Sequence, residues 1–186
     1  MTAPASPRQF WSRVLLLGVG NAARGDDAVG LVVAQRLQED PSLDLVTIRP
    51  TTGEGTGLLA LWQDTDAVVL VDAMWTGARA GTLQRFEVST QPLPAIFSRV
   101  STHAFGVAET IELARALCQL PPVLVVYGVE GATFETGAGL SAAVAAVVPQ
   151  AIARVRQELL TLTASRRQGC PPQGHQRGEP PCMKRL

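Results

Sequence analysis

Residues 14–30 read VLLLGVGNAARGDDAVG, and this stretch decides the fold. Its first six residues are apolar or glycine, which is typical of a strand covered on both faces of a sheet. A glycine-containing turn and the adjacent carboxylates Asp26 and Asp27 follow. Segment 27–38 then carries apolar residues at helical spacing, at Val29, Val32, Val33 and Leu37. The stretch therefore predicts a strand, a tight turn and a helix.

Apolar runs and helical patterns alternate along the rest of the chain. The sequence predicts strands at 13–19, 43–48, 66–72, 82–88 and 121–129, and helices at 27–38, 58–62, 102–118 and 140–162. Strand 82–88 alternates apolar and polar residues, so we expect it at a sheet edge. This order indicates an α/β fold with helices on both faces of a mostly parallel, twisted sheet of about five strands.

The totals indicate one globular domain. The 186 residues are 46% hydrophobic and 17% charged, and a formal net charge of zero argues against nucleic-acid binding. We expect a flexible leader at 1–12, the domain at 13–163 and a disordered Pro/Gly/basic tail at 164–186. An odd count of three cysteines favours a reducing, cytoplasmic location, and no stretch is long enough for membrane insertion.

Polar side chains with metal-binding chemistry follow three of the predicted elements. Asp26 and Asp27 come after the first strand, Asp72 ends the apolar run 66–72, and His103 stands near the start of helix 102–118. In open parallel sheets the binding crevice lies outside the carboxyl ends of the strands. Two carboxylates and one imidazole suit a divalent ion such as zinc or nickel. We therefore predict a metal site formed by Asp27, Asp72 and His103.

Each of these residues also has a structural interpretation. Asp26 and Asp27 could complement the helix dipole, Asp72 could fix a turn, and His103 could be an ordinary helix-start residue. The glycine turn raises a further alternative, because residues 18–23 fit G-x-G-x-x-G/A, the dinucleotide fingerprint. An acidic helix start opposes pyrophosphate binding there, although Arg49 after the second strand suits an NADP phosphate.

Three other features of the sequence give weaker indications of function. The loop Gly53–Gly57 is a candidate substrate-contacting segment or a plain connection. Cys118 lies on a largely apolar helix and is expected to be buried filler rather than a nucleophile. In the tail, the spacing of Cys170, His175 and Cys182 matches no common compact metal site.

Taken together, four motifs make the chain resemble the hydrogenase maturation endopeptidases over most of residues 13–160. They are LLLGVGNAARGDDAVG, TTGEGTGLLAL, VVLVDAM and STHAFG, in this order and spacing. The resemblance implies a three-layer α/β/α sandwich and a protease that trims the C-terminal extension from the precursor of a nickel–iron hydrogenase large subunit. It also implies metal contacts at Asp27, Asp72 and His103, with Asp27 standing where some relatives carry Glu.

The resemblance further implies the cofactor and the partner. The nickel is expected to be carried by the large-subunit precursor, and the isolated protein could hold another divalent ion such as zinc or cadmium. The ion would either polarise the scissile carbonyl or serve as a docking point while Asp26 or another carboxylate activates water. The enzyme would thus be of the aspartic or metallo type, and we expect a monomer. The alternatives are a non-cleaving chaperone for the precursor and an NADP-binding oxidoreductase domain.

Overall fold

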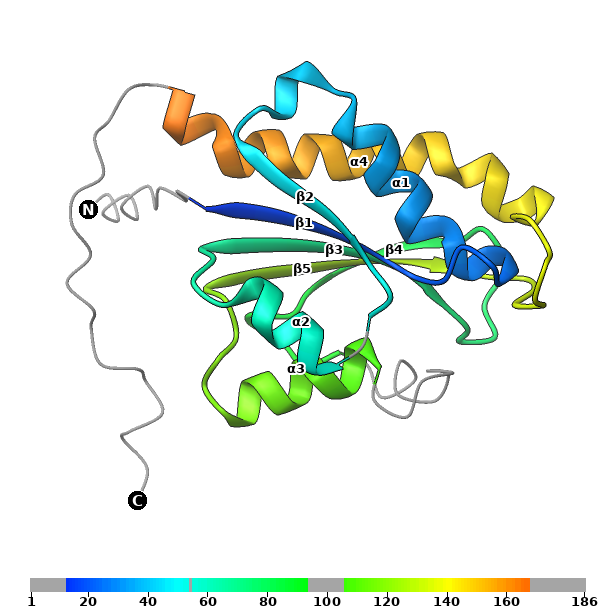
Figure 1. Cartoon of the computed structure of the whole chain (residues 1–186), viewed down its shortest axis with the longest axis horizontal. Helices are drawn as coiled ribbons and strands as arrows, with labels where there is room; N and C mark the ends of the chain where they lie inside the picture. Colours follow the sequence, from blue (N-terminus) through cyan, green and yellow to red (C-terminus); the bar gives the residue numbers. More distant parts are fainter. Residues whose placement is uncertain (1–12, 54, 94–105, 168–186) are drawn as a thin grey trace, which may run out of the picture.

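A computed structural model describes residues 13–53, 55–93 and 106–167 of the chain. Its centre is a five-stranded sheet in the order β2-β1-β3-β5-β4 (Figure 1). The strands are β1 (Val14–Val19), β2 (Val46–Thr51), β3 (Ala67–Met74), β4 (Leu83–Glu87) and β5 (Val123–Glu130). The first three and β5 run parallel, whereas β4 pairs antiparallel with β5 at the edge. The predicted mostly parallel sheet and its edge strand are confirmed.

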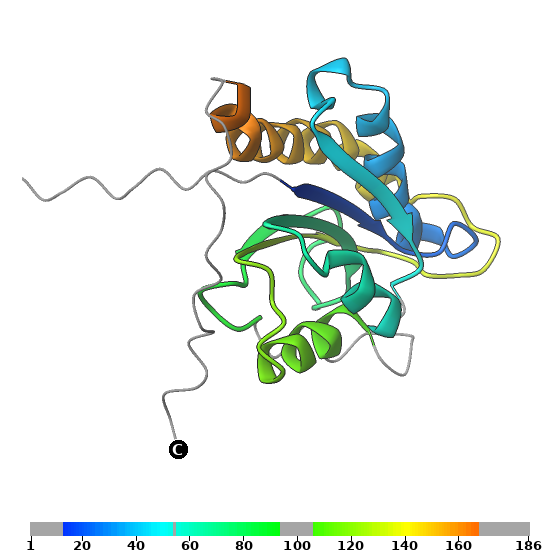
Figure 2. The same cartoon turned by 60° about the vertical axis from the view of Figure 1, so that its left-hand side comes forward.

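Helices cover both faces of this sheet and make three layers. Helices α1 (Val29–Gln38) and α4 (Ala142–Arg167) lie on one face, and α2 (Gly55–Trp62) and α3 (Val107–Ala116) lie on the other, as both views show (Figures 1 and 2). Side chains of β1 alternate between two cores because successive residues of a strand point to opposite faces. Leu16 packs with α1 and α4, whereas Leu17 packs with α2 and α3.

Close backbone packing joins α1 to the two central strands. A Cβ atom on Gly30 of α1 would overlap the carbonyl oxygens of Val19 and Val71, and one on Gly18 of β1 would overlap the Gly30 carbonyl oxygen. Only glycine permits this approach at both positions. The glycines of the opening stretch therefore bring the start of α1 onto the ends of β1 and β3.

The observed element bounds differ from the predicted ones in a few places. Strand β2 runs through Pro50, which an edge strand tolerates because it needs fewer ladder hydrogen bonds. Helix α2 begins at Gly55, inside the predicted loop, and α4 continues to Arg167 through an internal Pro149. Cys118, predicted to be buried, is exposed just after α3 with a left-handed φ of 55°, so that prediction was wrong.

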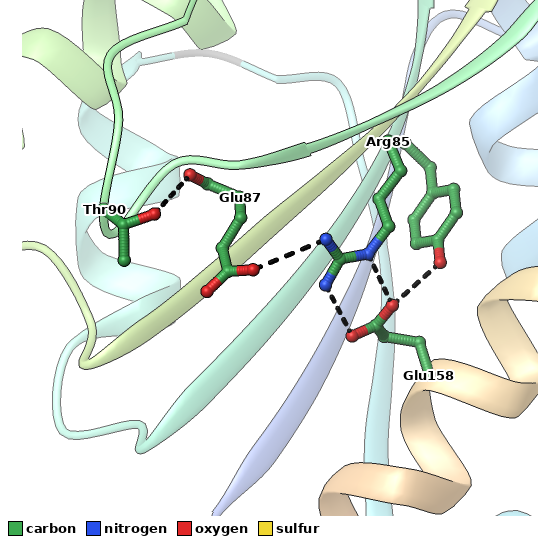
Figure 3. Close-up of polar contacts among 5 residues, drawn as sticks. Arg85, Glu87, Thr90 and Glu158 are labelled. Atoms are coloured by element: carbon green, nitrogen blue, oxygen red, sulfur yellow. Dashed lines mark hydrogen bonds and ion pairs between the residues drawn. The ribbon is translucent and has the colours of Figure 1, made fainter.

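A polar cluster fastens the edge strand β4 to the layer of α4. Arg85 donates two hydrogen bonds to Glu158 of α4, at 2.8 and 2.9 Å, and lies 3.5 Å from Glu87 (Figure 3). The hydroxyl of Tyr127 on β5 donates to the same Glu158 carboxylate at 2.9 Å. This fork-shaped pairing fixes α4 across β4 and β5. Of the helices in the described ranges, none is both long and apolar enough to cross a membrane.

Candidate active site

The carboxyl ends of β1 and β3 bring two of the predicted site residues to one edge of the sheet. The two strands are direct neighbours, with Gly18 paired to Val71, so the chain after β1 and the end of β3 lie side by side. Asp72 lies on β3, and Asp27 lies in the short 3-10 helix η1 (Gly25–Ala28) that leads from β1 into α1. Their carboxylates interact electrostatically. The predicted juxtaposition of Asp27 and Asp72 is therefore present.

The glycine turn positions the carboxylate of Asp27. Gly20 has a φ of 145°, and a Cβ atom there would overlap the backbone carbonyl oxygen of Asp27. The backbone N–H of Asn21 donates to Oδ2 of Asp27 at 3.0 Å, and the Asn21 side chain accepts from Ala23 at 2.9 Å. Asp27 itself is partly buried. The turn thus folds back on η1 and holds this side chain from the backbone.

Asp72 carries the clearest electrostatic perturbation of the site. Its removal from water and the nearby negative charge of Asp27 raise the pKa of Asp72 to about 7. A hydrogen bond from the backbone N–H of Ala73, 2.9 Å long, opposes this shift in pKa only in part. Two carboxylates in one partly buried place repel each other, and a cation between them would relieve that repulsion.

Asp26, the chain neighbour of Asp27, makes its contacts with a different segment of the protein. It is fully buried and accepts three backbone hydrogen bonds from the loop 131–141, from Ala132 (2.7 Å), Thr133 (3.1 Å) and Ser141 (2.6 Å). Burial alone would raise the pKa of Asp26, but together these hydrogen bonds hold it below its usual value. Both carboxylate oxygens are engaged, so the geometry assigns Asp26 a structural role and gives no support to water activation by it.

The third predicted ligand, His103, lies outside the described residues. Across residues 13–53, 55–93 and 106–167, no group of three or more His, Cys, Asp or Glu side chains could hold a metal ion. The described part of the site is therefore a carboxylate pair. The tail residues Cys170, His175 and Cys182 also lie outside the described ranges.

A second buried acid, Glu130, stands at the same sheet edge and was not singled out from the sequence. Its side chain is 1% exposed and accepts hydrogen bonds from the backbone N–H groups of Thr76 and Gly77, at 2.7 and 2.9 Å. The hydroxyl of Thr76 donates to its other oxygen at 2.8 Å. Glu130 closes an apolar strand just as Asp72 does, so the same pattern would have found it.

The loop proposed as substrate-contacting has a packing role at one end. Gly53 is buried with a φ of 81°, and a Cβ atom there would lie 2.5 Å from Cγ1 of Val19. Its glycine is therefore needed for the contact between the end of β2 and the end of β1. Gly57 has open space around its Cα, with no heavy atom within 4 Å of an added Cβ.

Comparisons with known proteins agree with this architecture. Residues 33–158 match the sequence model of a family described as hydrogenase maturation protease, a span that includes Asp72 and begins after Asp27. The hydrogenase 2 maturation protease of Escherichia coli K12 is 30% identical over 146 residues, which cover 77% of this chain and 88% of that protein. The hydrogenase expression/formation protein HupD of Rhodobacter capsulatus is 29% identical, over 79% of this chain and 71% of its own.

Solved structures show the same fold. The hydrogenase maturating endopeptidase HybD from E. coli superposes with a TM-score of 0.67 at 28% identity, covering 84% of this chain and 94% of its own. The [NiFe] hydrogenase maturation protease HycI from Thermococcus kodakarensis gives a TM-score of 0.60 at 28% identity, covering 81% and 94%. The three-layer α/β/α fold expected from the sequence is confirmed. The chain belongs to the hydrogenase maturation protease family, a family of endopeptidases.

Proposed function

We propose that this protein removes the C-terminal extension of a nickel-loaded [NiFe] hydrogenase large-subunit precursor. The observation that carries the proposal is the Asp27–Asp72 carboxylate pair at the carboxyl edge of the sheet. This chain presents the pair and belongs to a protease family. The precursor is the partner, and its nickel ion is part of the substrate. We propose that the enzyme works in the cytoplasm as a monomer that binds the precursor transiently.

The described residues fit a divalent cation at this place. Asp27 and Asp72, together with His103 from the sequence, would hold the nickel of the precursor, or zinc or cadmium in the isolated protein. Two neighbouring carboxylates without a cation repel each other, and this repulsion contributes to the raised pKa of Asp72. A bound ion of this kind supplies Lewis acidity, which polarises a carbonyl and acidifies water.

The contributions of the chain itself follow from its contacts. The N–H of Asn21 orients Asp27, and the N–H of Ala73 orients Asp72, so both carboxylates are held before a substrate arrives. Preorganised groups of this kind lower the cost of ordering the site during the reaction. The carboxylate of Asp26 is engaged in hydrogen bonds to the loop 131–141, so we assign the positioning of water to other groups. The metallo-type scheme is therefore the one that we favour over an aspartic type that uses Asp26.

The test is the intact mass of the large-subunit precursor after incubation with the protein, with nickel-loaded and metal-free precursor run in parallel. The proposal expects a discrete C-terminal loss in the nickel-loaded sample only. Asp27→Ala, Asp72→Ala and His103→Ala should each abolish this loss while leaving a folded protein. Association without any mass loss would instead identify a non-cleaving chaperone, and NADPH binding in place of association would identify the dinucleotide alternative. Normal trimming by all three variants would refute the assigned site.

A further inference from the structure

A pair of aromatic side chains lies just after the end of β3, the strand that carries Asp72. Trp75 follows β3 directly, three residues beyond Asp72, and its ring centroid is 5.3 Å from that of Phe134 at an interplanar angle of 33°. Trp75 is 48% exposed, whereas Phe134 is partly buried. Large, rigid aromatic side chains such as Trp contribute much of the binding energy in protein interfaces. An accessible Trp therefore indicates a surface that can bind a partner.

The turn that carries Trp75 is fixed by the buried Glu130. The carboxylate of Glu130 accepts the N–H groups of Thr76 and Gly77 and the hydroxyl of Thr76, so the two residues after Trp75 are tied to the end of β5. The residue before it, Met74, accepts a hydrogen bond from the N–H of Gly131 at 2.9 Å. The exposure of Trp75 is therefore imposed by an ordered turn.

The loop that carries Phe134 is fixed by the buried Asp26. Asp26 accepts the N–H groups of Ala132 and Thr133, the two residues before Phe134. The ring of Phe134 also covers Gly131, because a Cβ atom at Gly131 would lie 2.5 Å from the ring. The buried carboxylates of Glu130 and Asp26 thus fix the segments that carry Trp75 and Phe134, respectively. Asp26 is also the chain neighbour of Asp27.

We propose that Trp75 and Phe134 form a specificity subsite for an apolar side chain of the precursor, about three residues from the scissile bond. This inference rests on the proposed function. The rise of an extended chain is about 3.3 Å per residue, so the three residues from Asp72 to Trp75 span about 10 Å. A precursor segment bound in extended form at the carboxylate pair covers the same length with three of its own residues. An apolar side chain of that segment then reaches the aromatic surface.

The first test measures steady-state trimming of the nickel-loaded precursor by Trp75→Ala and Phe134→Ala. Each variant should raise KM about tenfold and change kcat by less than about twofold, since the aromatic pair binds substrate without touching the reacting bond. Trp75→Phe should recover most of the affinity. Leu117→Ala removes a side chain of comparable exposure, 51%, next to the far end of α3 and should leave both constants unchanged.

The second test locates the residue that the pair binds. Each precursor residue within about five positions of the scissile bond is changed to Ala or Asp and is assayed with wild-type enzyme and with Trp75→Ala. One apolar position about three residues from the bond should lose affinity with wild-type enzyme and should show no further loss with Trp75→Ala, as coupled residues do. Additive effects at every position, or an unchanged KM for Trp75→Ala, would overturn the subsite.

The proposed function fails in a different way. If Asp72→Ala still trims the precursor, the carboxylate pair is not the active site and the subsite loses its basis. If Asp72→Ala is inactive and Trp75→Ala retains a normal KM, only the subsite is refuted. Circular dichroism of each variant shows whether the fold is intact, and the exposed position of Trp75 leads us to expect that it is.

Discussion

Asp26 and Asp27 are adjacent in the chain, but their carboxylates make separate sets of contacts. Asp26 is fully buried and accepts three backbone hydrogen bonds from the loop 131–141. Asp27 is partly exposed, accepts one from Asn21 and contributes its charge at Asp72. One carboxylate therefore anchors the loop while its neighbour faces the site. Substitution of Asp26 should therefore mainly affect stability, whereas substitution of Asp27 should mainly affect trimming.

The first prediction concerns the anchor. Asp26→Asn should lower the free energy of unfolding by about 2 kcal/mol at pH 7, because its amide group cannot accept all three N–H groups. Hydrogen bonds hold the pKa of Asp26 below its usual value in the folded state, so this stabilisation is present above the unfolded pKa of about 3.9. It is lost as the pH falls through the folded pKa. Urea unfolding measures the difference in the free energy of unfolding between variant and wild type. This difference should be smaller at pH 3 than at pH 7.

Glu135→Gln is the matched control for this anchor. Glu135 lies in the same loop and is exposed, and its substitution should change stability by less than about 0.5 kcal/mol. Equal unfolding free energies for Asp26→Asn and Glu135→Gln would contradict the anchoring role.

The second prediction is a conflict between stability and activity at Asp72. Burial and the charge of Asp27 raise the pKa of Asp72 to about 7, far above the unfolded value of about 3.9. The folded metal-free protein therefore loses stability as the pH rises through 7, and Asp72→Asn escapes this loss. The variant should be more stable than wild type at pH 8 by about 1 kcal/mol or more, which raises Tm by about 2–4 °C. It should also fail to trim the precursor.

Thermal unfolding of metal-free wild type and Asp72→Asn at pH 8 and at pH 5 checks this second prediction. The difference in Tm between variant and wild type should be large at pH 8. It should narrow at pH 5, where Asp72 of the folded wild type is protonated and is uncharged like the asparagine of the variant. A wild-type protein as stable as the variant at pH 8 would show that Asp72 is not electrostatically strained.

The third prediction compares two glycines. Gly20→Ala should destabilise the fold by about 2 kcal/mol or more, because its φ is 145° and the added Cβ would overlap the Asp27 backbone. It should also reduce trimming, since the turn that holds Asp27 must move. Gly57→Ala in helix α2 has open space around it and should stabilise the protein by about 0.5 kcal/mol. Chemical denaturation of the pair tests this, and equal shifts in midpoint would refute the packing argument.

The fourth prediction uses Tyr127, which is the only tyrosine of the chain. Burial and its hydrogen bond to Glu158 raise the pKa of Tyr127 to about 12. A spectrophotometric titration of the folded protein should therefore show no phenolate near pH 10, the usual tyrosine pKa. Glu158→Gln should lower the midpoint, although burial keeps it above 10. A wild-type midpoint near 10 in the folded state would contradict the network seen in Figure 3.

Much of the fold could be predicted from the sequence because its buried strands are continuous apolar runs. The apolar runs ending in Val19 and Asp72 predict buried strands, and both strands have neighbours on either side in the sheet. Strand 82–88 alternates, and it is an edge strand. The bounds of β2 and α2 were less accurate, because Pro50 disfavours a strand and the glycines around Gly55 disfavour a helix, and tertiary packing overrides both local preferences.

The site was predicted in part. Asp27 and Asp72 could be placed together because one follows β1 and the other lies near the carboxyl end of the adjacent parallel strand β3. The separate contacts of Asp26 and Asp27 could not be predicted, since those of Asp26 depend on a loop more than a hundred residues further along the chain. The contact between Trp75 and Phe134 also joins two distant segments, and no local pattern in the sequence reports it. The role of His103 stays a prediction.

The Asp26 anchor also has a consequence for the order in which the protein is made. Its partners Ala132, Thr133 and Ser141 lie 106, 107 and 115 residues downstream. On a ribosome, chains emerge from the N-terminus at about 5–20 residues per second, so the segment with Asp27 is exposed for several seconds before its anchor exists. Until residue 141 has been synthesised, the nascent chain lacks the contacts that complete its working edge.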